Sequence, residues 1–156
     1  MMGAGGGGGG GGGGMQQLQQ EIEQLEQEME AIDEEVARLE EKKSDIDDAV
    51  EAIDVLESGA TVQVPLGGDA YLRATVDDID EVVVSLGGGY AAERDQEGAV
   101  STLRTKQETL DEHISGLESD KNEVQSEMDE LEQQAQQMQQ QQMQQMMQQQ
   151  EEQGDE

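Results

Sequence analysis

Residues 61–95 read TVQVPLGGDAYLRATVDDIDEVVVSLGGGYAAERD, and this stretch decides how the rest of the chain is organised. Apolar and polar side chains alternate over residues 61–66 and again over 70–76. Such alternation is typical of half-buried β-strands. Residues 67–69 (Gly-Gly-Asp) lie between the two runs and tolerate the positive φ angles of a tight turn. The two runs therefore predict a β-hairpin.

A second hairpin follows directly. Residues 81–86 form a third apolar run, residues 87–89 are three glycines, and residues 90–93 form a short fourth strand. We therefore expect two hairpins in tandem, within a linker that covers residues 59–97.

These four short strands contain too little apolar surface to form a core of their own. Their open edges would also be templates for pairing with other chains, unless strands from several subunits close into one barrel. We therefore expect an obligate oligomer that assembles through the hairpins. The residues expected to carry this assembly are Val62, Val64, Leu66, Leu72, Val82, Val83, Val84 and Leu86.

The composition excludes several classes of protein. The 156 residues include no Cys, Trp or Phe and only two Tyr, so no large globular core can form. A net charge of -30 argues against binding to nucleic acids or anionic membranes, and no apolar run is long enough to span a bilayer. No signal peptide is recognisable, so we expect a cytoplasmic protein. Because Lys is scarce beside so many acids, we expect adaptation to molar salt, which screens self-repulsion.

A helix is predicted for residues 16–58, and residues 1–15, which are rich in Gly, are expected to be a flexible tether. Both Met1 and Met15 are candidate start residues. Apolar residues repeat with the spacing of a coiled coil, and Gly59 suits a left-handed helix end. The seam consists of Leu18, Ile22, Leu25, Met29, Ile32, Val36, Leu39, Lys43, Ile46, Val50 and Ile53.

A second coiled-coil helix is predicted for residues 98–138. Its seam consists of Val100, Leu103, Gln107, Leu110, Ile114, Leu117, Lys121, Val124, Met128, Leu131, Ala135 and Met138. Because both helices meet the same compact linker, we expect them to pair antiparallel. One register places Ile53 beside Val100 and Ile22 beside Leu131, and a register one heptad further along the second helix fits as well. The polar seam residues are interpreted as devices that fix the register.

Residues 139–156 form an acidic tail rich in Met and Gln, in which the apolar seam fades. The tail is either a frayed end without consequence or an adhesive end, because Met side chains adapt to many apolar shapes. We favour adhesion. The residues expected to bind a client protein are Leu18, Ile22, Leu131, Met138, Met143, Met146 and Met147.

No catalytic, cofactor-binding or metal-binding residues are predicted. His113 is the single histidine, and its heptad position lies on the flank of the seam. The acidic loop at residues 77–81 lacks the ligand spacing of a calcium loop, and the glycine turns lack the Lys and helix of a phosphate-binding loop. An enzyme is therefore the least favoured class.

The order helix, two hairpins, helix, with the linker VPLGGDAYLRATVDDIDEVVVSLGGGYAAERD at residues 64–95, resembles the alpha-class subunit of archaeal prefoldin. The resemblance covers residues 16–138. It implies a hexamer of two alpha and four beta-class subunits, with strands joined in a barrel and six coiled coils projecting from it. It also implies that the coiled-coil tips hold unfolded polypeptides without ATP and pass them to a group II chaperonin.

We therefore expect an α+β, predominantly α fold: a long antiparallel coiled-coil hairpin whose helices are joined by two β-hairpins that enter an oligomeric β-barrel. The expected function is that of an ATP-independent chaperone, a holdase without cofactors. The alternative is a structural coiled-coil scaffold that binds no client. Suppression of aggregation without nucleotide would distinguish the two.

Overall fold

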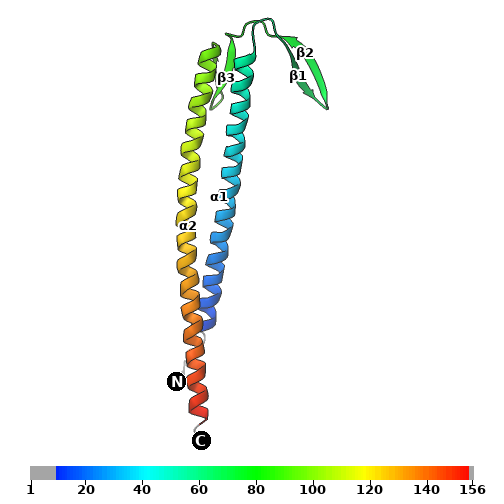
Figure 1. Ribbon diagram of the computed structural model, residues 1–156. Coiled ribbons are helices and arrows are strands. Elements are labelled where there is room, and N and C mark those ends of the chain that lie inside the picture. The colour runs from blue at the N-terminus through cyan, green and yellow to red at the C-terminus, as the bar shows by residue number, and fades with distance from the viewer. Residues whose placement is uncertain (1–9, 155–156) are drawn as a thin grey trace, which may run out of the picture. The chain divides into compact units, whose positions relative to one another are not determined.

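The computed structural model describes residues 10–154, with side chains from residue 13 onward. It contains two helices and four short strands, in the predicted order (Figure 1). These are α1 (Gly10–Val55), β1 (Thr61–Gly67), β2 (Ala70–Thr75), β3 (Val82–Gly87), β4 (Tyr90–Arg94) and α2 (Gln96–Gln153). The predicted α+β fold, predominantly helical with two hairpins between long helices, is confirmed.

The predicted start of α1 was too late. The helix begins at Gly10, so residues 10–14 of the expected tether are helical, while residues 1–9 lie outside the described part of the chain. Glycine has a low helix propensity, so these residues contribute little stability to the helix that they extend. Gly14 also lies close to the other helix, because a Cβ atom added there would be 2.8 Å from Cε of Met138.

The start of α2 also differs from the prediction, since the helix begins at Gln96, two residues before residue 98, and is capped by Asp95. Its Oδ1 atom accepts a hydrogen bond of 2.7 Å from the Gly98 N–H, and its carbonyl accepts one of 2.8 Å from Ala99. A side-chain acceptor at this position satisfies an N–H group that has no partner within the helix. A Cβ at Gly98 would be 2.6 Å from that same Oδ1 atom, so a larger residue there would displace the capping carboxylate.

At its other end α2 continues to Gln153, so residues 139–153 are helical and not frayed, while the adhesive role of the tail stays a prediction. Gln, Met and Glu all have high helix propensity, and the first helix-breaking residue is Gly154. The apolar seam nevertheless ends at Met138 as predicted, because the side chains of residues 139–154 are all exposed.

The described residues divide into two compact parts, residues 36–115 with both hairpins and residues 10–35 with 116–154. Within each part, segments of α1 and α2 lie side by side and run antiparallel (Figure 1). All predicted seam residues of both helices are buried or half-buried. The heptad prediction is therefore confirmed. The buried seam residues are Leu39, Val50, Leu103, Ile114, Val124 and Met128.

The first of the two predicted registers is confirmed. Val50 packs in one cluster with Leu103, its predicted neighbour, and not with a residue one heptad further along. In the other compact part, Lys121 forms an ion pair of 2.7 Å with Asp33, which also fits this register.

The polar seam residues bind across the helix pair, as their interpretation as register devices requires. The Lys43 ammonium forms an ion pair with Asp111, and this hydrogen bond raises the pKa of Lys43 above its usual value. The Gln107 amide donates to the carbonyl of Lys43 over 2.9 Å and to Oδ1 of Asp47 over 2.8 Å. Hydrogen bonds from Gln107 and Arg104 lower the pKa of Asp47.

The strands form two separate antiparallel sheets of two strands each, β1 with β2 and β3 with β4. The turn residues Gly67, Gly68 and Asp69 all have positive φ, as predicted, and so do residues 87–89. The register of each pair shifts just before its turn, so that Leu66 and Leu86 are both bulge residues. The two hairpins therefore repeat one local geometry.

Only the second hairpin joins the described core. Val84 is 4 % exposed and packs with Val50, Ala99 and Leu103, and the half-buried Val82 packs against this cluster. The expectation that the strands bury their apolar face only against another subunit is therefore wrong for Val84. The side chain of Ala99 is small, which leaves room for β3 to approach the helices.

A short turn connects α1 to the first hairpin. Gly59 has a φ of 89°, as expected for a left-handed residue, but α1 has already ended at Val55. Gly59 instead lies inside a turn closed by a 3.0 Å hydrogen bond from the Ala60 N–H to the Glu57 carbonyl. Its own N–H donates to the Val76 carbonyl over 2.7 Å, which extends the pairing of the hairpin.

Candidate functional site

The exposed large apolar side chains of the described residues gather in two places, with Val55 at the end of α1 as the exception. The first place is the two hairpins, and the second is the last part of α2. We call the first set the hairpin surface. It consists of Val64, Leu66, Tyr71, Leu72, Val83, Leu86 and Tyr90.

The structure separates the eight residues that were predicted to carry assembly. Val64, Leu66, Leu72, Val83 and Leu86 are exposed, as an assembly surface requires. Val62 and Val82 are half-buried, and Val84 is buried within its own chain. Adjacent residues of β3 thus have opposite roles, because successive side chains of a strand point to opposite faces. Val84 faces the helices, and Val83 faces away and is 66 % exposed.

Sequence reasoning missed two members of the hairpin surface, Tyr71 and Tyr90. They are the only tyrosines of the chain and are 60 % and 76 % exposed. Tyr71 pairs with Pro65 across the first hairpin, and Tyr90 pairs with Gly87 across the second. The sequence held a signal, since a Tyr follows each of the two glycine turns. Aromatic residues exposed beside open strands are typical of protein interfaces.

Every strand has one edge without a partner among the described residues, since each sheet contains two strands only. Exposed edges of this kind present unpaired N–H and C=O groups that pair readily with another strand. The hairpins therefore offer both main-chain hydrogen-bonding groups and apolar side chains to a neighbouring chain.

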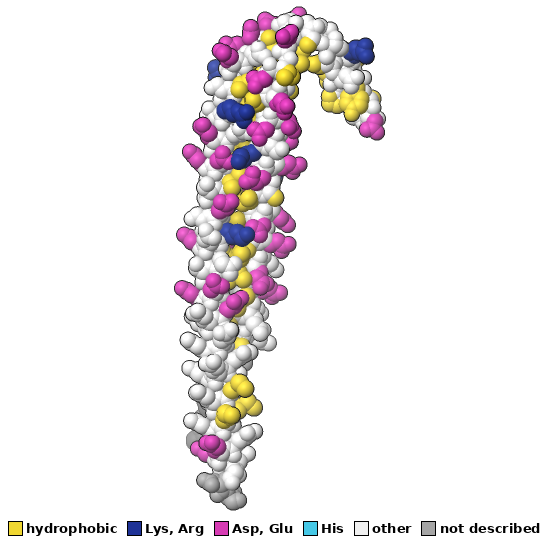
Figure 2. Space-filling view, viewed as in Figure 1, with side chains coloured by type: hydrophobic (Ala, Val, Ile, Leu, Met, Phe, Trp, Pro, Cys, Tyr) yellow, Lys and Arg dark blue, Asp and Glu magenta, His cyan; other side chains and the backbone are white. Residues whose placement is uncertain are grey.

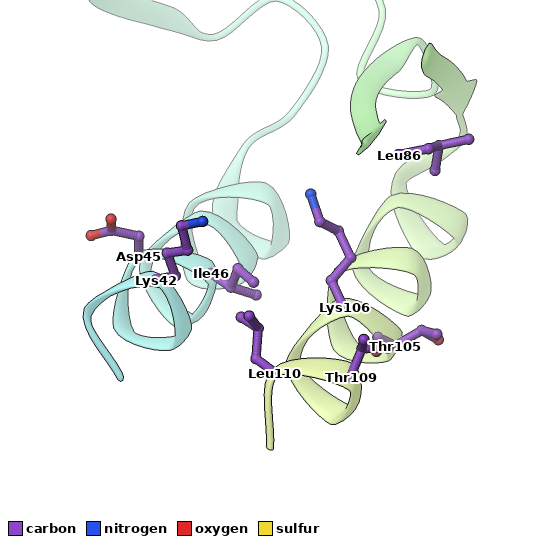
Figure 3. Close-up of a pocket in the computed structure, with 8 residues that line it drawn as sticks. All are labelled: Lys42, Asp45, Ile46, Leu86, Thr105, Lys106, Thr109 and Leu110. Atoms are coloured by element: carbon purple, nitrogen blue, oxygen red, sulfur yellow. The ribbon is translucent and has the colours of Figure 1, made fainter. Parts of the chain in front are cut away.

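A side-chain hydrogen bond from α2 to β3 holds the second hairpin in place. The Lys106 ammonium donates a hydrogen bond of 2.8 Å to the Ser85 carbonyl of β3. Beside it lies a cavity of about 470 Å³ (Figure 3). The cavity is lined by Lys42, Asp45, Ile46, Leu86, Thr105, Lys106, Thr109 and Leu110.

This cavity lacks the arrangement that catalysis requires. In Figure 3, Ile46 and Leu110 approach each other from opposite helices to form an apolar floor. The hydroxyl groups of Thr105 and Thr109 donate to carbonyls of their own helix, those of Ser101 and Thr105, over 3.1 and 3.2 Å. None of the lining residues is a His, and neither hydroxyl is hydrogen-bonded to a base.

The second exposed place is the end of α2. Met143, Met146 and Met147 are 69 %, 66 % and 69 % exposed. Their spacing of three and four residues places them on one side of the helix. Figure 2 shows hydrophobic side chains gathered near this end of α2, apart from the line of hydrophobic atoms along the seam. We call these three residues the Met stripe.

The structure divides the residues that were predicted to bind a client. Leu18, Ile22, Leu131 and Met138 are half-buried in the seam, where the two helices already cover part of their surface. Only the three residues of the Met stripe present most of their surface to solvent. The stripe lies outside the seam register, so exposing it does not cost the coiled coil any packing.

Three further features of residues 10–154 concern the single histidine, metal binding and membrane spans. The side chain of His113 is exposed on α2. Among the described residues, no group of three or more His, Cys, Asp or Glu side chains could hold a metal ion. Neither described helix is long and apolar enough to cross a membrane.

Known proteins resemble this chain in sequence. A family model described as Prefoldin subunit matches residues 18–141. Prefoldin subunit alpha of Haloarcula marismortui is 76 % identical over 115 residues, which cover 74 % of this chain and 75 % of the relative. Prefoldin subunit alpha of Haloquadratum walsbyi is 60 % identical over 111 residues, which cover 71 % of this chain and 69 % of the relative. These relatives come from halophilic archaea, as the expectation of a halophilic protein suggests.

Solved structures resemble the chain as well. A cryo-EM structure of filamentous PFD from Methanocaldococcus jannaschii has a TM-score of 0.50 and 26 % identity, and covers 76 % of this chain and 94 % of the matched chain. The crystal structure of the prefoldin beta subunit from Thermococcus strain KS-1 also has a TM-score of 0.50, with 19 % identity over 78 % of this chain and 89 % of that chain. The second likeness concerns the fold alone.

Proposed function

This chain belongs to the prefoldin family of chaperones, and we propose that it is an ATP-independent holdase that captures unfolded polypeptides and passes them to a group II chaperonin. The observation that carries the proposal is the placement of exposed apolar side chains. They gather on the hairpins and on the last part of α2, while both helices bury their seam.

We assign the hairpin surface to assembly. Its open strand edges and exposed Tyr and Leu side chains suit pairing with strands of other subunits, which would remove the edges from solvent. The proposed assembly is a hexamer of two alpha and four beta-class subunits, joined through a β-barrel. Val84 and Lys106 support it indirectly, because they hold the second hairpin against its own helices.

We assign the Met stripe to client capture. Thioether side chains are flexible and adapt to varied apolar shapes, which suits a binder of many unfolded sequences. Burying each side chain contributes on the order of 1.5 kcal/mol, too little to hold a client alone. Several subunits on one platform raise the effective concentration of the remaining stripes, so that weak contacts add up.

The test uses the chain assembled with a beta-class subunit in high salt, without nucleotide. The complex is expected to suppress aggregation of a chemically unfolded protein. Deleting residues 139–156 is expected to reduce capture without changing the oligomeric mass. A variant that combines Met143→Gln, Met146→Gln and Met147→Gln is the matched control for the deletion. It keeps the length and helix propensity of α2 and removes only the apolar side chains.

Two results would contradict parts of this proposal. If the deletion leaves capture undiminished, the binding surface moves to the distal seam around Leu18, Ile22 and Leu131. If the assembled complex fails to suppress aggregation at all, the chain acts as a structural coiled-coil scaffold and not as a holdase.

A further inference from the structure

The methionines of this chain occupy two contrasting environments. The chain has nine Met and no Cys, so all of its sulfur atoms are thioether sulfurs. Among the described residues, Met128 is buried in the seam, and Met15, Met29 and Met138 are half-buried. The three residues of the Met stripe are about two-thirds exposed or more. An oxidant dissolved in water must reach the sulfur atom to react, so the two groups differ in reactivity.

We propose that the Met stripe is a reversible oxidation site, at which conversion of Met143, Met146 and Met147 to sulfoxides switches client capture off. The inference rests on the proposed function, because it assigns regulation to the same surface. The oxidant is a peroxide, and the reductant is a thiol-dependent methionine sulfoxide reductase.

The chemistry is balanced in both directions. A lone pair on the thioether sulfur attacks one oxygen of hydrogen peroxide, so that the O–O bond breaks and an S–O bond forms. Sulfur loses two electrons, and the second oxygen leaves as water after a proton shift. In the reverse step two thiols are oxidised to one disulfide, and the sulfoxide oxygen leaves as water.

The position of the Met stripe on α2 decides what oxidation to sulfoxide changes. The three side chains lie outside the heptad seam, so polar sulfoxides there would not disturb the packing between α1 and α2. Sulfoxides are polar and chiral where thioethers are apolar, and they disrupt surfaces that depend on Met. Oxidation would therefore remove the adhesive property of the stripe and leave the fold intact. Met128 would be spared, because the seam covers its sulfur.

The experiment treats the assembled complex with dilute hydrogen peroxide in high salt. Peptide mapping by mass spectrometry should find sulfoxide at the three stripe positions first, at Met138 more slowly and at Met128 last. Capture of a chemically unfolded protein should fall by about fivefold or more, because several weakened stripes lose their combined effect. Helicity by circular dichroism should not change. Methionine sulfoxide reductases specific for each sulfoxide epimer should restore capture.

Two variants make the result specific. In the first, Met143→Leu, Met146→Leu and Met147→Leu are combined, which keeps apolar side chains and removes the reactive sulfur. Client capture by this variant is measured before and after peroxide, each variant serving as its own reference, and peroxide should not lower it. In the second, Met128→Leu alone should leave the sensitivity to peroxide unchanged.

The outcomes separate this inference from the proposed function. The oxidation switch is wrong if peroxide abolishes capture by the triple Leu variant as it does in the wild type. It is also wrong if wild-type capture survives full oxidation of the stripe while the triple Gln variant has lost capture. In both cases the holdase surface stands. If the triple Gln variant captures normally without any oxidant, the stripe does not bind clients. Both proposals for it then fail.

Discussion

The side chain of Gln96, the first residue of α2, caps the end of α1 through the carbonyl of Ile53. Its amide nitrogen donates to that carbonyl over 2.6 Å and to the Leu56 carbonyl over 3.2 Å. The last carbonyls of a helix have no partners within it, and this side chain satisfies that of Ile53 together with that of Leu56, just past the end of α1. The main-chain N–H of Gln96 also donates to Oδ1 of Asp80 over 3.3 Å. This residue therefore connects both helices and the loop before β3.

We predict that Gln96→Met, which keeps the length of the side chain and removes the amide, lowers the free energy of unfolding by about 1 to 3 kcal/mol. Thermal melting followed by circular dichroism in high salt measures the change. Gln134→Met is the matched control, because Gln134 is exposed on α2. Equal losses in the two variants would show that the cap contributes nothing specific.

Val83 and Val84 should respond differently to substitution. Val83→Lys places a charge on the exposed face of β3, so we expect the subunit to keep its helicity and melting temperature and to lose assembly with the beta-class subunit. Val84→Lys places an ammonium against Val50, Ala99 and Leu103, at a cost on the order of several kcal/mol. It should therefore destabilise the isolated subunit as well. Light scattering measures the oligomeric mass, and normal assembly of both variants would rule out the barrel.

Folding should depend on salt. With a net charge of -30, segments of the two helices repel each other in dilute buffer. The screening length falls from about 10 Å at 0.1 M to about 3 Å at 1 M, so the seam closes fully only in concentrated salt. Circular dichroism in about 0.05 M and about 2 M KCl should show lower helicity and a lower melting temperature in the dilute buffer. Identical curves would contradict adaptation to high salt.

The contribution of Asp47 should disappear in acid. Hydrogen bonds from Gln107 and Arg104 lower its pKa in the folded state, so folding favours the ionised carboxylate. This stabilisation is present above the ordinary Asp value of about 3.9 and is lost as the pH falls through the lower folded value. The difference in melting temperature between the wild type and Asp47→Asn should therefore be constant near neutral pH and shrink below about pH 4. A difference that stays constant down to pH 2 or so would exclude this linkage.

The sequence by itself determined the local features of this protein. The heptad spacing identified the seam residues of both helices, because a helix turns by a fixed angle per residue and so brings them to one face. The glycine turns at residues 67–69 and 87–89 were equally readable, since few residues accept positive φ. The linker between the helices also carried enough of a family pattern to indicate a prefoldin alpha-class subunit.

Tertiary structure decided which of these residues are available to other molecules. Alternation along β3 shows that Val83 and Val84 face opposite ways, but only the packing of β3 on Ala99 shows that Val84 is the buried one. The cap from Gln96 to Ile53 joins residues that lie 43 positions apart, beyond the reach of any local pattern. The heptad pattern placed Met138 in the seam, yet Met138 was still expected to bind a client together with the Met stripe. The fold shows that Met138 is half-buried while the stripe is exposed. Periodicity is a property of neighbouring residues, whereas exposure depends on contacts between segments far apart in the chain.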